Sequence, residues 1–189
     1  MRKNNSLIVG GTKGIGKVIS SVLEKRGDNI FTVSRNTRKK NNITLDLLSN
    51  KQQICKQLEY FFLKNKIFFD NIILCQRYRG KNPLEEFQVS VHSSKYLIDY
   101  IVAKNKIKNS IVFISSISTV TIVHDQNIDY HSSRAAINEM SKYYAIKLGP
   151  KKITSNCVLP TKIIKPENQK FYNKRGNKIT KMMKLITPI

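Results

Sequence analysis

The sequence predicts an α/β protein, a single doubly wound domain with a mainly parallel sheet of about six strands. Three observations lead to this fold class. Short apolar runs without polar alternation recur along the 189 residues, as in strands that are buried on both faces. Segments with helical spacing of apolar residues separate these runs, which is the order expected when helices cover a parallel sheet. A glycine-rich turn also joins the first expected strand to the first helix.

The first half of the chain begins with SLIV (residues 6–9), an apolar run typical of a buried strand. A helix is expected at residues 17–27, where Gly27 is placed to end it. Its apolar residues recur at helical spacing: Val18, Ile19, Val22 and Leu23. The next elements are expected to be strands at residues 29–34 and 43–45, a helix at 51–65 and a strand at 71–75.

The second half continues the same alternation. A long helix is expected at residues 83–105, with Pro83 in its first turn. Residues 110–116 (SIVFISS) form the most apolar expected strand, and Pro160 ends another at residues 151–160. The helix expected at residues 129–148 has one apolar face, made of Ile137, Met140, Tyr144 and Leu148. Residues 165–189 are also expected to be helical, and no repeat or linker divides residues 1–189, so we expect one domain.

Composition narrows the function classes. The net charge of +22 invites a nucleic-acid partner. Because the cations are spread along the whole chain without any recognition-helix, zinc-finger or RNA-binding signature, we expect no specific nucleic-acid function. Three cysteines and three histidines show no metal-ligand spacing, so no metal site is expected. No apolar stretch is long enough for a membrane helix or a signal peptide, so we expect no membrane contact and a cytoplasmic protein.

The turn after the first expected strand reads VGGTKGIGK and places Gly10, Gly14 and Gly16 in a G-x-x-x-G-x-G spacing. Such glycines let the chain turn tightly, let the backbone approach a pyrophosphate and let the helix pack against the strand. The helix amino terminus then faces the negative charge. An ordinary glycine-rich connection is the alternative, and the position between a strand and a helix favours a dinucleotide site.

The stretch GGTKGIG resembles the glycine motif of the short-chain dehydrogenase/reductase family, and further motifs of that family follow in order. Asp46-Leu47 in TLDLLS resembles its acidic residue at the adenine ring, and FISSIS resembles the strand that ends in its catalytic serine, here Ser116. YHSSRAAI resembles its Y-x-x-x-K segment, and NCVLPT its N-x-x-x-P-G stretch beside the nicotinamide. The resemblance extends from residue 6 to about residue 165 and implies one Rossmann-type domain that binds a nicotinamide dinucleotide.

The resemblance also implies a reaction, hydride transfer between the nicotinamide and a carbonyl or alcohol carbon. Tyr130 would be the general acid/base, and Ser116 would hydrogen-bond the reacting oxygen. Arg134 would supply the cation that a phenol needs in order to work near neutral pH. The implied cofactor-binding residues are Gly10, Thr12, Lys13, Gly14, Ile15, Gly16, Ser34, Arg35, Asp46, Leu47, Cys75, Gln76, Arg134, Pro160 and Ile163. A serine hydrolase is excluded because the chain has no G-x-S-x-G motif.

Charge at the end of the second strand indicates which dinucleotide binds. An acidic residue there would bind a free ribose 2′-hydroxyl, whereas an arginine accommodates a 2′-phosphate. This chain has Ser34-Arg35 and no acid, and Lys13 adds a second cation, as in NADP-preferring members of the family. Arg38 is a possible third cation. We therefore expect NADP(H), with NAD(H) as the less favoured alternative.

Three positions depart from the family pattern. Arg134 stands in place of the lysine, and because an arginine keeps its proton it cannot relay one. LCQRYRG stands where N-N-A-G is usual, which places Cys75 and Gln76 beside the cofactor. Ser90 stands where the family has an asparagine that anchors a relay water. These changes leave two alternatives, an active oxidoreductase or a catalytically impaired NADP(H)-binding protein that acts as a sensor or scaffold.

Length is a further departure. Family members usually continue with a final helix and a last sheet strand, roughly a strand-helix-strand unit's worth of residues. Three explanations stay open: completion of the sheet by another chain, truncation, or a repurposed protein. Residues 161–189 correspond to the substrate loop and helix, so the identity of the small carbonyl or alcohol substrate is not predicted. The expected partner is a second copy of this chain, bound through the helices at 84–104 and 129–148.

Overall fold

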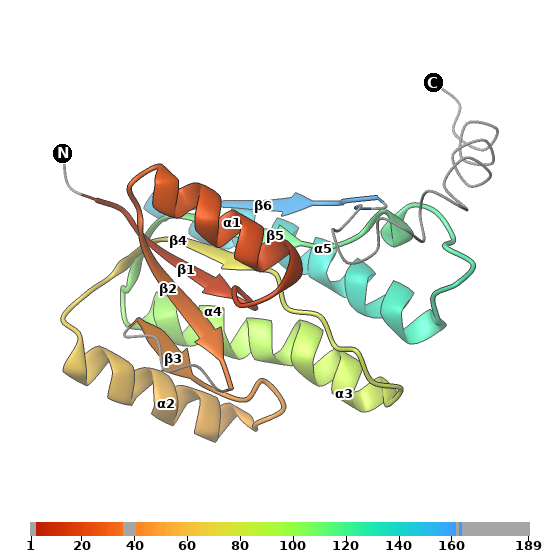
Figure 1. The fold of residues 1–189 in the computed structure, drawn as a ribbon, viewed down its shortest axis with the longest axis horizontal. Coiled ribbons are helices and arrows are strands. Elements are labelled where there is room, and N and C mark those ends of the chain that lie inside the picture. Colours follow the sequence, from red (N-terminus) through yellow and green to blue (C-terminus); the bar gives the residue numbers. More distant parts are fainter. Residues whose placement is uncertain (1–2, 36–40, 162, 164–189) are drawn as a thin grey trace.

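Six parallel strands form one sheet in the order β3-β2-β1-β4-β5-β6 (Figure 1). The structure is a computed structural model that describes residues 3–35, 41–161 and 163. The strands are β1 (Asn5–Val9), β2 (Asn29–Ser34), β3 (Asn42–Thr44), β4 (Phe69–Leu74), β5 (Ile107–Ile114) and β6 (Thr154–Val158). The predicted doubly wound parallel sheet is therefore confirmed. The expected helix at 165–189, the substrate loop and Arg38 lie outside the described residues.

The helices lie on both faces of the sheet (Figure 1). They are α1 (Gly14–Lys25), α2 (Lys51–Lys64), α3 (Pro83–Phe87), α4 (Ser93–Ala103) and α5 (Ile128–Leu148). One buried apolar cluster lies between the sheet and the helices α2, α4 and α5. Ile137, Tyr144 and Leu148, which the sequence placed on one face of α5, all belong to this cluster, and Met140 packs against it.

Helix α1 lies on the opposite face, alongside β1 and β2 (Figure 1). It begins at Gly14, directly after the glycine loop and earlier than the spacing of its apolar residues predicted. Two of those apolar residues, Val18 and Val22, are exposed. Gly27 has φ of 100°, so it ends the helix in the left-handed conformation that glycine adopts readily.

The long helix predicted at residues 83–105 is present as continuous helical backbone from Pro83 to Ala103, but one segment of it is not α-helical. A π-helical turn at Gln88–His92 separates α3 from α4. Two serines at the start of α4 bind carbonyl oxygens four residues back, Ser93 to Val89 and Ser94 to Ser90. Such wider turns are frequent at functional sites, and this one contains Ser90.

The order of the strands fixes where a ligand can bind. From β1 the chain moves outward to β2 and β3, and then crosses back so that β4 pairs with the other side of β1. In an open parallel sheet such a switch opens a crevice at the carboxyl ends of the two central strands. The glycine loop follows β1 and Cys75-Gln76 follows β4, so both predicted segments lie at this crevice.

A polar row crosses the α1 face of the sheet at its amino-terminal end. The Ser6 hydroxyl donates to Asp28 at 2.7 Å and accepts from the Asn71 amide at 3.1 Å. Arg26 donates to the Asp28 carboxylate at 2.7 Å. Burial raises the pKa of Asp28, but the hydrogen bonds from Arg26 and Ser6 and the Arg26 charge outweigh it and leave that pKa below its ordinary value.

We expect Asp28→Asn to lower the free energy of unfolding at pH 7 by about 1 kcal/mol, because Arg26 is half exposed and partly screened. A carboxyl with a lowered folded-state pKa stabilises above its unfolded pKa of about 3.9, and this contribution disappears as the pH falls through the folded value. Urea unfolding at pH 7 and near pH 2.5 measures both effects. The exposed Glu24→Gln on α1 is the control, and an equal loss for Asp28→Asn at both pH values would contradict the linkage.

Neither a membrane-spanning helix nor a metal-binding cluster is found in the described residues. Within residues 3–35, 41–161 and 163, no helix is long and apolar enough to cross a membrane. Over the same described residues, no cluster of three or more histidine, cysteine or acidic side chains could hold a metal ion.

Candidate functional site

The glycine loop after β1 has the shape that the sequence predicted. Gly10 has φ of 78°, and a Cβ there would lie 3.0 Å from backbone atoms of Gln76. A Cβ at Gly16 would collide with the carbonyl oxygen of Gly10. Larger residues at either position would therefore push the loop away from β4 or α1.

The amino terminus of α1 is open to a ligand. Its N-cap residue, Lys13, makes no side-chain hydrogen bond to the first turn, and that turn has no acidic residue. The amide groups of this turn and the helix dipole therefore favour an anion, which fits a dinucleotide pyrophosphate. Lys13 is exposed beside it, while Thr12 and Ile15 are half-buried.

The predicted adenosine-binding residues lie at the end of β2 and after β3. The Ser34 hydroxyl donates to the Asn42 side chain at 2.9 Å, and Arg35 follows as an exposed cation. The exposed Asp46 carboxylate accepts from the Leu48 amide at 3.0 Å. Leu47 is half-buried against the apolar cluster. These side chains lie at the carboxyl end of the sheet, on the side of the glycine loop away from β5.

Cys75 and Gln76 lie at the end of β4, directly against Gly10 of the glycine loop. The Cys75 amide donates to the Val9 carbonyl at 2.9 Å. Burial raises the pKa of the Cys75 thiol to about 12, so this cysteine stays protonated and is no nucleophile. The Gln76 amide nitrogen donates to Ser94 at 2.5 Å, and its buried carbonyl oxygen has no partner among the described residues.

Ser116 follows β5, where several contacts fix its loop. Its hydroxyl oxygen accepts from the Ser118 amide at 3.2 Å, and the adjacent Ile117 amide donates to the Pro160 carbonyl at 3.1 Å. This bond brings the two predicted segments FISSIS and NCVLPT together. Ile163 lies beyond Pro160 and is exposed.

His131 also holds this loop, a role that the sequence did not indicate. Its ring nitrogens lie 2.8 Å from the Ser118 carbonyl and 3.3 Å from the Val123 carbonyl. The histidine next to Tyr130 therefore connects the start of α5 to the loop that contains Ser116.

Tyr130 lies in the first turn of α5, where its amide donates to the side chain of Asn127 at 2.9 Å. Two arginines face its ring. The guanidinium carbon of Arg77 is 4.6 Å from the ring centroid, and that of Arg134 is 5.1 Å from it. The structure therefore confirms that Tyr130 and Arg134 are neighbours and adds Arg77, which the sequence analysis missed. Arg77 also donates to Gln126 at 2.8 Å.

Arg134 is buried in an ion pair that the sequence analysis also missed. Its Nη2 lies 3.0 Å from Glu86 Oε1 and 2.5 Å from the Ser90 hydroxyl. The hydroxyl of Ser133 donates to the same Glu86 oxygen at 2.8 Å. A signal was present, since Glu86 and Ser90 are four positions apart and face the same way on a helix.

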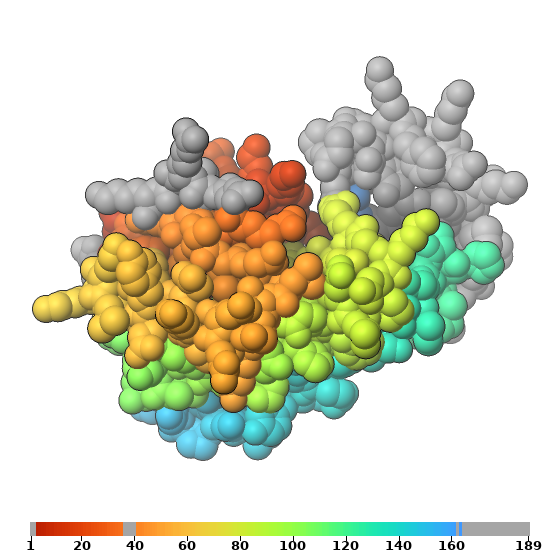
Figure 2. All heavy atoms as spheres, turned by 90° about the horizontal axis from the view of Figure 1, so that it is seen from below, coloured from red at the N-terminus to blue at the C-terminus, as the bar shows by residue number. Residues whose placement is uncertain are grey.

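A cavity of about 390 Å³ opens beside Tyr130. It lies between the loop that leads into α3 and the segment before α5, and the Glu86 side chain also reaches it. Figure 2 shows a hollow between the red and orange part of the chain and the yellow-green segment near residue 80, and no residue of the red and orange part lines the cavity beside Tyr130. The lining residues are Arg77 to Pro83, Glu86, Asp125 to Asn127, Asp129 and Tyr130.

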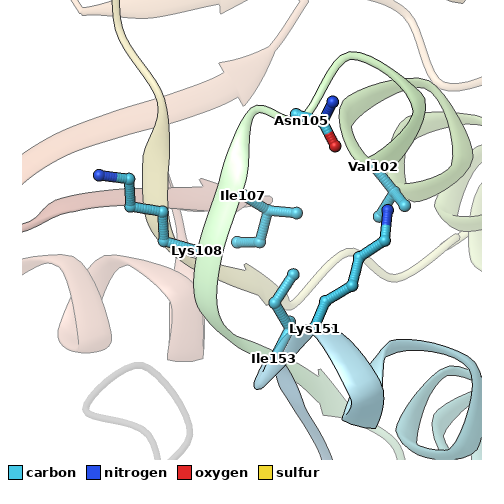
Figure 3. A pocket seen from close by; sticks show the side chains of 6 residues that line it. All are labelled: Val102, Asn105, Ile107, Lys108, Lys151 and Ile153. Carbon is cyan, nitrogen blue, oxygen red and sulfur yellow. The ribbon is translucent and has the colours of Figure 1, made fainter.

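A second cavity, of about 240 Å³, lies at the amino ends of β5 and β6 (Figure 3). It is lined by Val102, Asn105, Ile107, Lys108, Lys151 and Ile153. Lys108 is engaged elsewhere, because its ammonium lies 3.5 Å from the centroid of the Phe68 ring. None of the predicted site residues lines this cavity.

Comparison with known proteins agrees with this arrangement. Residues 78–188 match the family model described as Enoyl-(Acyl carrier protein) reductase. A tropinone reductase homologue of Arabidopsis thaliana is 25% identical, over 82% of this chain and 67% of its own. An L-rhamnose 1-dehydrogenase (NADP(+)) of Thermoplasma acidophilum is 29% identical, over 87% of this chain and 74% of its own.

Among solved structures, a short chain dehydrogenase family protein from Francisella tularensis superposes with a TM-score of 0.73. It is 27% identical and covers 95% of this chain and 78% of its own.

Proposed function

Because this chain belongs to the short-chain dehydrogenase/reductase family, we propose that it transfers a hydride between NADP(H) and a carbonyl or alcohol substrate. The observation that carries the proposal is the position of Tyr130. Two guanidinium groups lie over its ring, beside a cavity at the carboxyl end of the sheet.

The residues present fit a nicotinamide dinucleotide. Gly10 and Gly16 allow a close approach that any Cβ would block, and the first turn of α1, which the Lys13 side chain does not cap, has an amino-terminal dipole that favours the pyrophosphate. The buried Gln76 carbonyl, unpartnered among the described residues, is an acceptor on the same crevice. When bound, NADPH supplies the hydride.

In the proposed reduction, Tyr130 donates its phenolic proton to the substrate oxygen, and the cations Arg77 and Arg134 stabilise the phenolate that remains. The proton returns to the phenolate from solvent after each turnover. Ser116 donates a hydrogen bond to the same oxygen and orients the carbonyl. In the oxidation direction Tyr130 acts as the base.

The charge of the adenosine end supports NADP(H) over NAD(H). Arg35 follows β2 as an exposed cation, and Lys13 lies exposed at the start of α1. The name of the Thermoplasma relative, a dehydrogenase that uses NADP(+), points the same way. We propose that Arg35 binds the 2′-phosphate as a charged hydrogen-bond donor.

Arg35→Ala is expected to raise the KM for NADPH about 10- to 100-fold and to leave the KM for NADH nearly unchanged, because a hydrogen bond between charged groups contributes about 1.5–3 kcal/mol. Initial rates with each cofactor measure the split. Lys56→Ala, which removes an exposed cation from α2, is the control for net charge. Equal losses with NADPH and NADH would contradict a role at the 2′-phosphate.

A second candidate function is NADP(H) binding without efficient turnover, as a sensor or scaffold. The observation in its favour is that the Arg134 guanidinium is already bound to Glu86 and Ser90. NADPH oxidation over a panel of carbonyl compounds, compared between the natural chain and Tyr130→Phe, separates the two. Tight NADPH binding with no Tyr130-dependent turnover on any compound would overturn the oxidoreductase.

We also propose that two copies of the chain associate through α4 and α5. The two helices are connected by the hydroxyl of Tyr144, which donates to Asp99 at 2.8 Å. The outer face of α5 exposes Tyr143 by 57% and Ile146 by 82%. Such apolar exposure on a helix is typical of a surface that a partner covers. In such a dimer, each copy would contribute the proposed single domain, residues 1–189.

A further inference from the structure

Two of the departures from the family pattern touch each other. Ser90 replaces an asparagine and Arg134 replaces a lysine, and the Arg134 Nη2 lies 2.5 Å from the Ser90 hydroxyl. Arginine is longer than lysine and serine is shorter than asparagine, so the two changes compensate in size. The π-helical turn at Gln88–His92 contains Ser90 and faces α5 at this point.

Glu86 is the centre of this contact. Its Oε1 accepts from three donors: the Arg134 guanidinium at 3.0 Å, Ser90 at 2.7 Å and Ser133 at 2.8 Å. The side chains of Arg134 and Glu86 are only 3% and 9% exposed. Because water has little access to this pair, the Glu86 carboxylate, and not the solvent, compensates the charge of Arg134.

The same arginine faces the proposed acid/base. The guanidinium carbon of Arg134 lies 5.1 Å from the centroid of the Tyr130 ring. The Ser133 hydroxyl, which donates to Glu86, also lies 3.1 Å from the Tyr130 carbonyl and so connects Glu86 to the backbone of Tyr130. Glu86 additionally lines the cavity that Tyr130 lines. The carboxylate is therefore placed to fix where the guanidinium lies and to reduce its positive field at the phenol.

We propose that Glu86 is a positioning residue of this active site, which holds Arg134 against the Tyr130 ring and offsets part of its charge. The inference rests on the proposed function of Tyr130. It makes Glu86, Ser90 and Arg134 one hydrogen-bonded unit.

The charge balance at Tyr130 gives the inference a measurable consequence. Arg77 and Arg134 face the ring, and His131 contacts its edge. Removing the Glu86 carboxylate leaves the Arg134 cation uncompensated, which favours the phenolate. The other charged residues on the shared cavity are Arg79, Lys81, Asp125 and Asp129, and Glu86→Gln leaves all of them in place.

The test is an ultraviolet titration of tyrosinate in four proteins: the natural chain, Glu86→Gln, and each of these with Tyr130→Phe. Subtracting each Tyr130→Phe curve isolates the ionisation of Tyr130. We expect Glu86→Gln to move its midpoint down by about one pH unit, since a compensating anion is removed from a neighbouring cation. Glu139→Gln, the same substitution in an exposed ion pair of α5, is expected to leave the midpoint unchanged.

An unchanged Tyr130 midpoint in a folded Glu86→Gln protein would overturn the inference, because a purely structural carboxylate would not alter the titration. If Glu86→Gln does not fold, Glu86→Asp retains the charge but moves the carboxylate away from Arg134. A smaller downward shift is then expected, and no shift would overturn the inference equally.

The titration requires no turnover, so the two failures are distinguishable. A natural chain that never oxidises NADPH would contradict the proposed function, while the titration would still decide the role of Glu86. If the chain is active, the pH profile of kcat should shift in the same direction and by the same amount as the titration in Glu86→Gln. If the natural chain is active but Glu86→Gln changes neither the pH profile of kcat nor the Tyr130 titration, only the proposed role of Glu86 is contradicted.

Discussion

Tyr130→Phe is expected to lower kcat for NADPH-dependent carbonyl reduction by about 10²–10⁴-fold, the usual contribution of a positioned general acid. The ring keeps its contacts with Arg77 and Arg134, because only the hydroxyl is removed. The affinity for NADPH, measured by fluorescence titration, is therefore expected to be unchanged. Initial rates at saturating substrate measure the loss.

Tyr143→Phe is the matched control. Tyr143 lies on the same helix, is 57% exposed and hydrogen-bonds only to Lys147 in the described part of the chain. Its variant should keep the activity of the natural chain. If Tyr130→Phe were equally active, the proton would have to come from another group, and the proposed role of Tyr130 would be wrong.

Arg134→Met is expected to lower the free energy of unfolding by about 3–5 kcal/mol, because it leaves the Glu86 carboxylate buried without its cation. Methionine has nearly the length of the arginine stem, so the loss of charge dominates over the loss of packing. Urea unfolding followed by circular dichroism measures the difference. Turnover should fall as well, since a cation beside the phenol is lost.

Two comparisons isolate the charge in this experiment. The double variant Glu86→Gln with Arg134→Met removes both charges, so it should recover much of the stability. Lys142→Met breaks an exposed ion pair with Glu139 on the same helix and should cost less than about 1 kcal/mol. If Arg134→Met were no more destabilising than Lys142→Met, the buried pair would have no structural role.

Local sequence could predict most of the scaffold. Short strand-like runs predicted all six strands, and the clearest of them, β1, is an apolar run buried on both faces. The helix predicted at 83–105 is present, but the spacing of its apolar residues gave no sign of the π-helical turn at Gln88–His92, which lies against α5.

The sequence likewise could identify some residues of the candidate site and not others. Gly10 and Gly16 could be identified from their spacing, since the loop needs them for its own backbone geometry. Ser116 and Tyr130 could be identified from short motifs, each within a few residues. The spacing of Glu86 and Ser90 was a signal, but the pairing of Glu86 with Arg134 and of Arg77 with Gln126 was not visible, because these partners are 48 and 49 residues apart in the chain.

The sequence by itself determined the strand and helix pattern of the sheet, the glycine loop and the tyrosine with a cation four positions later, because the signals for these lie in short stretches of the chain. Only the tertiary structure decided which anion compensates that cation. The packing of α3 and the π-helical turn against α5 excludes water from Arg134, and a buried guanidinium requires a carboxylate within hydrogen-bonding distance. The pairing of Arg134 with Glu86 and Ser90 is thus a property of the folded chain.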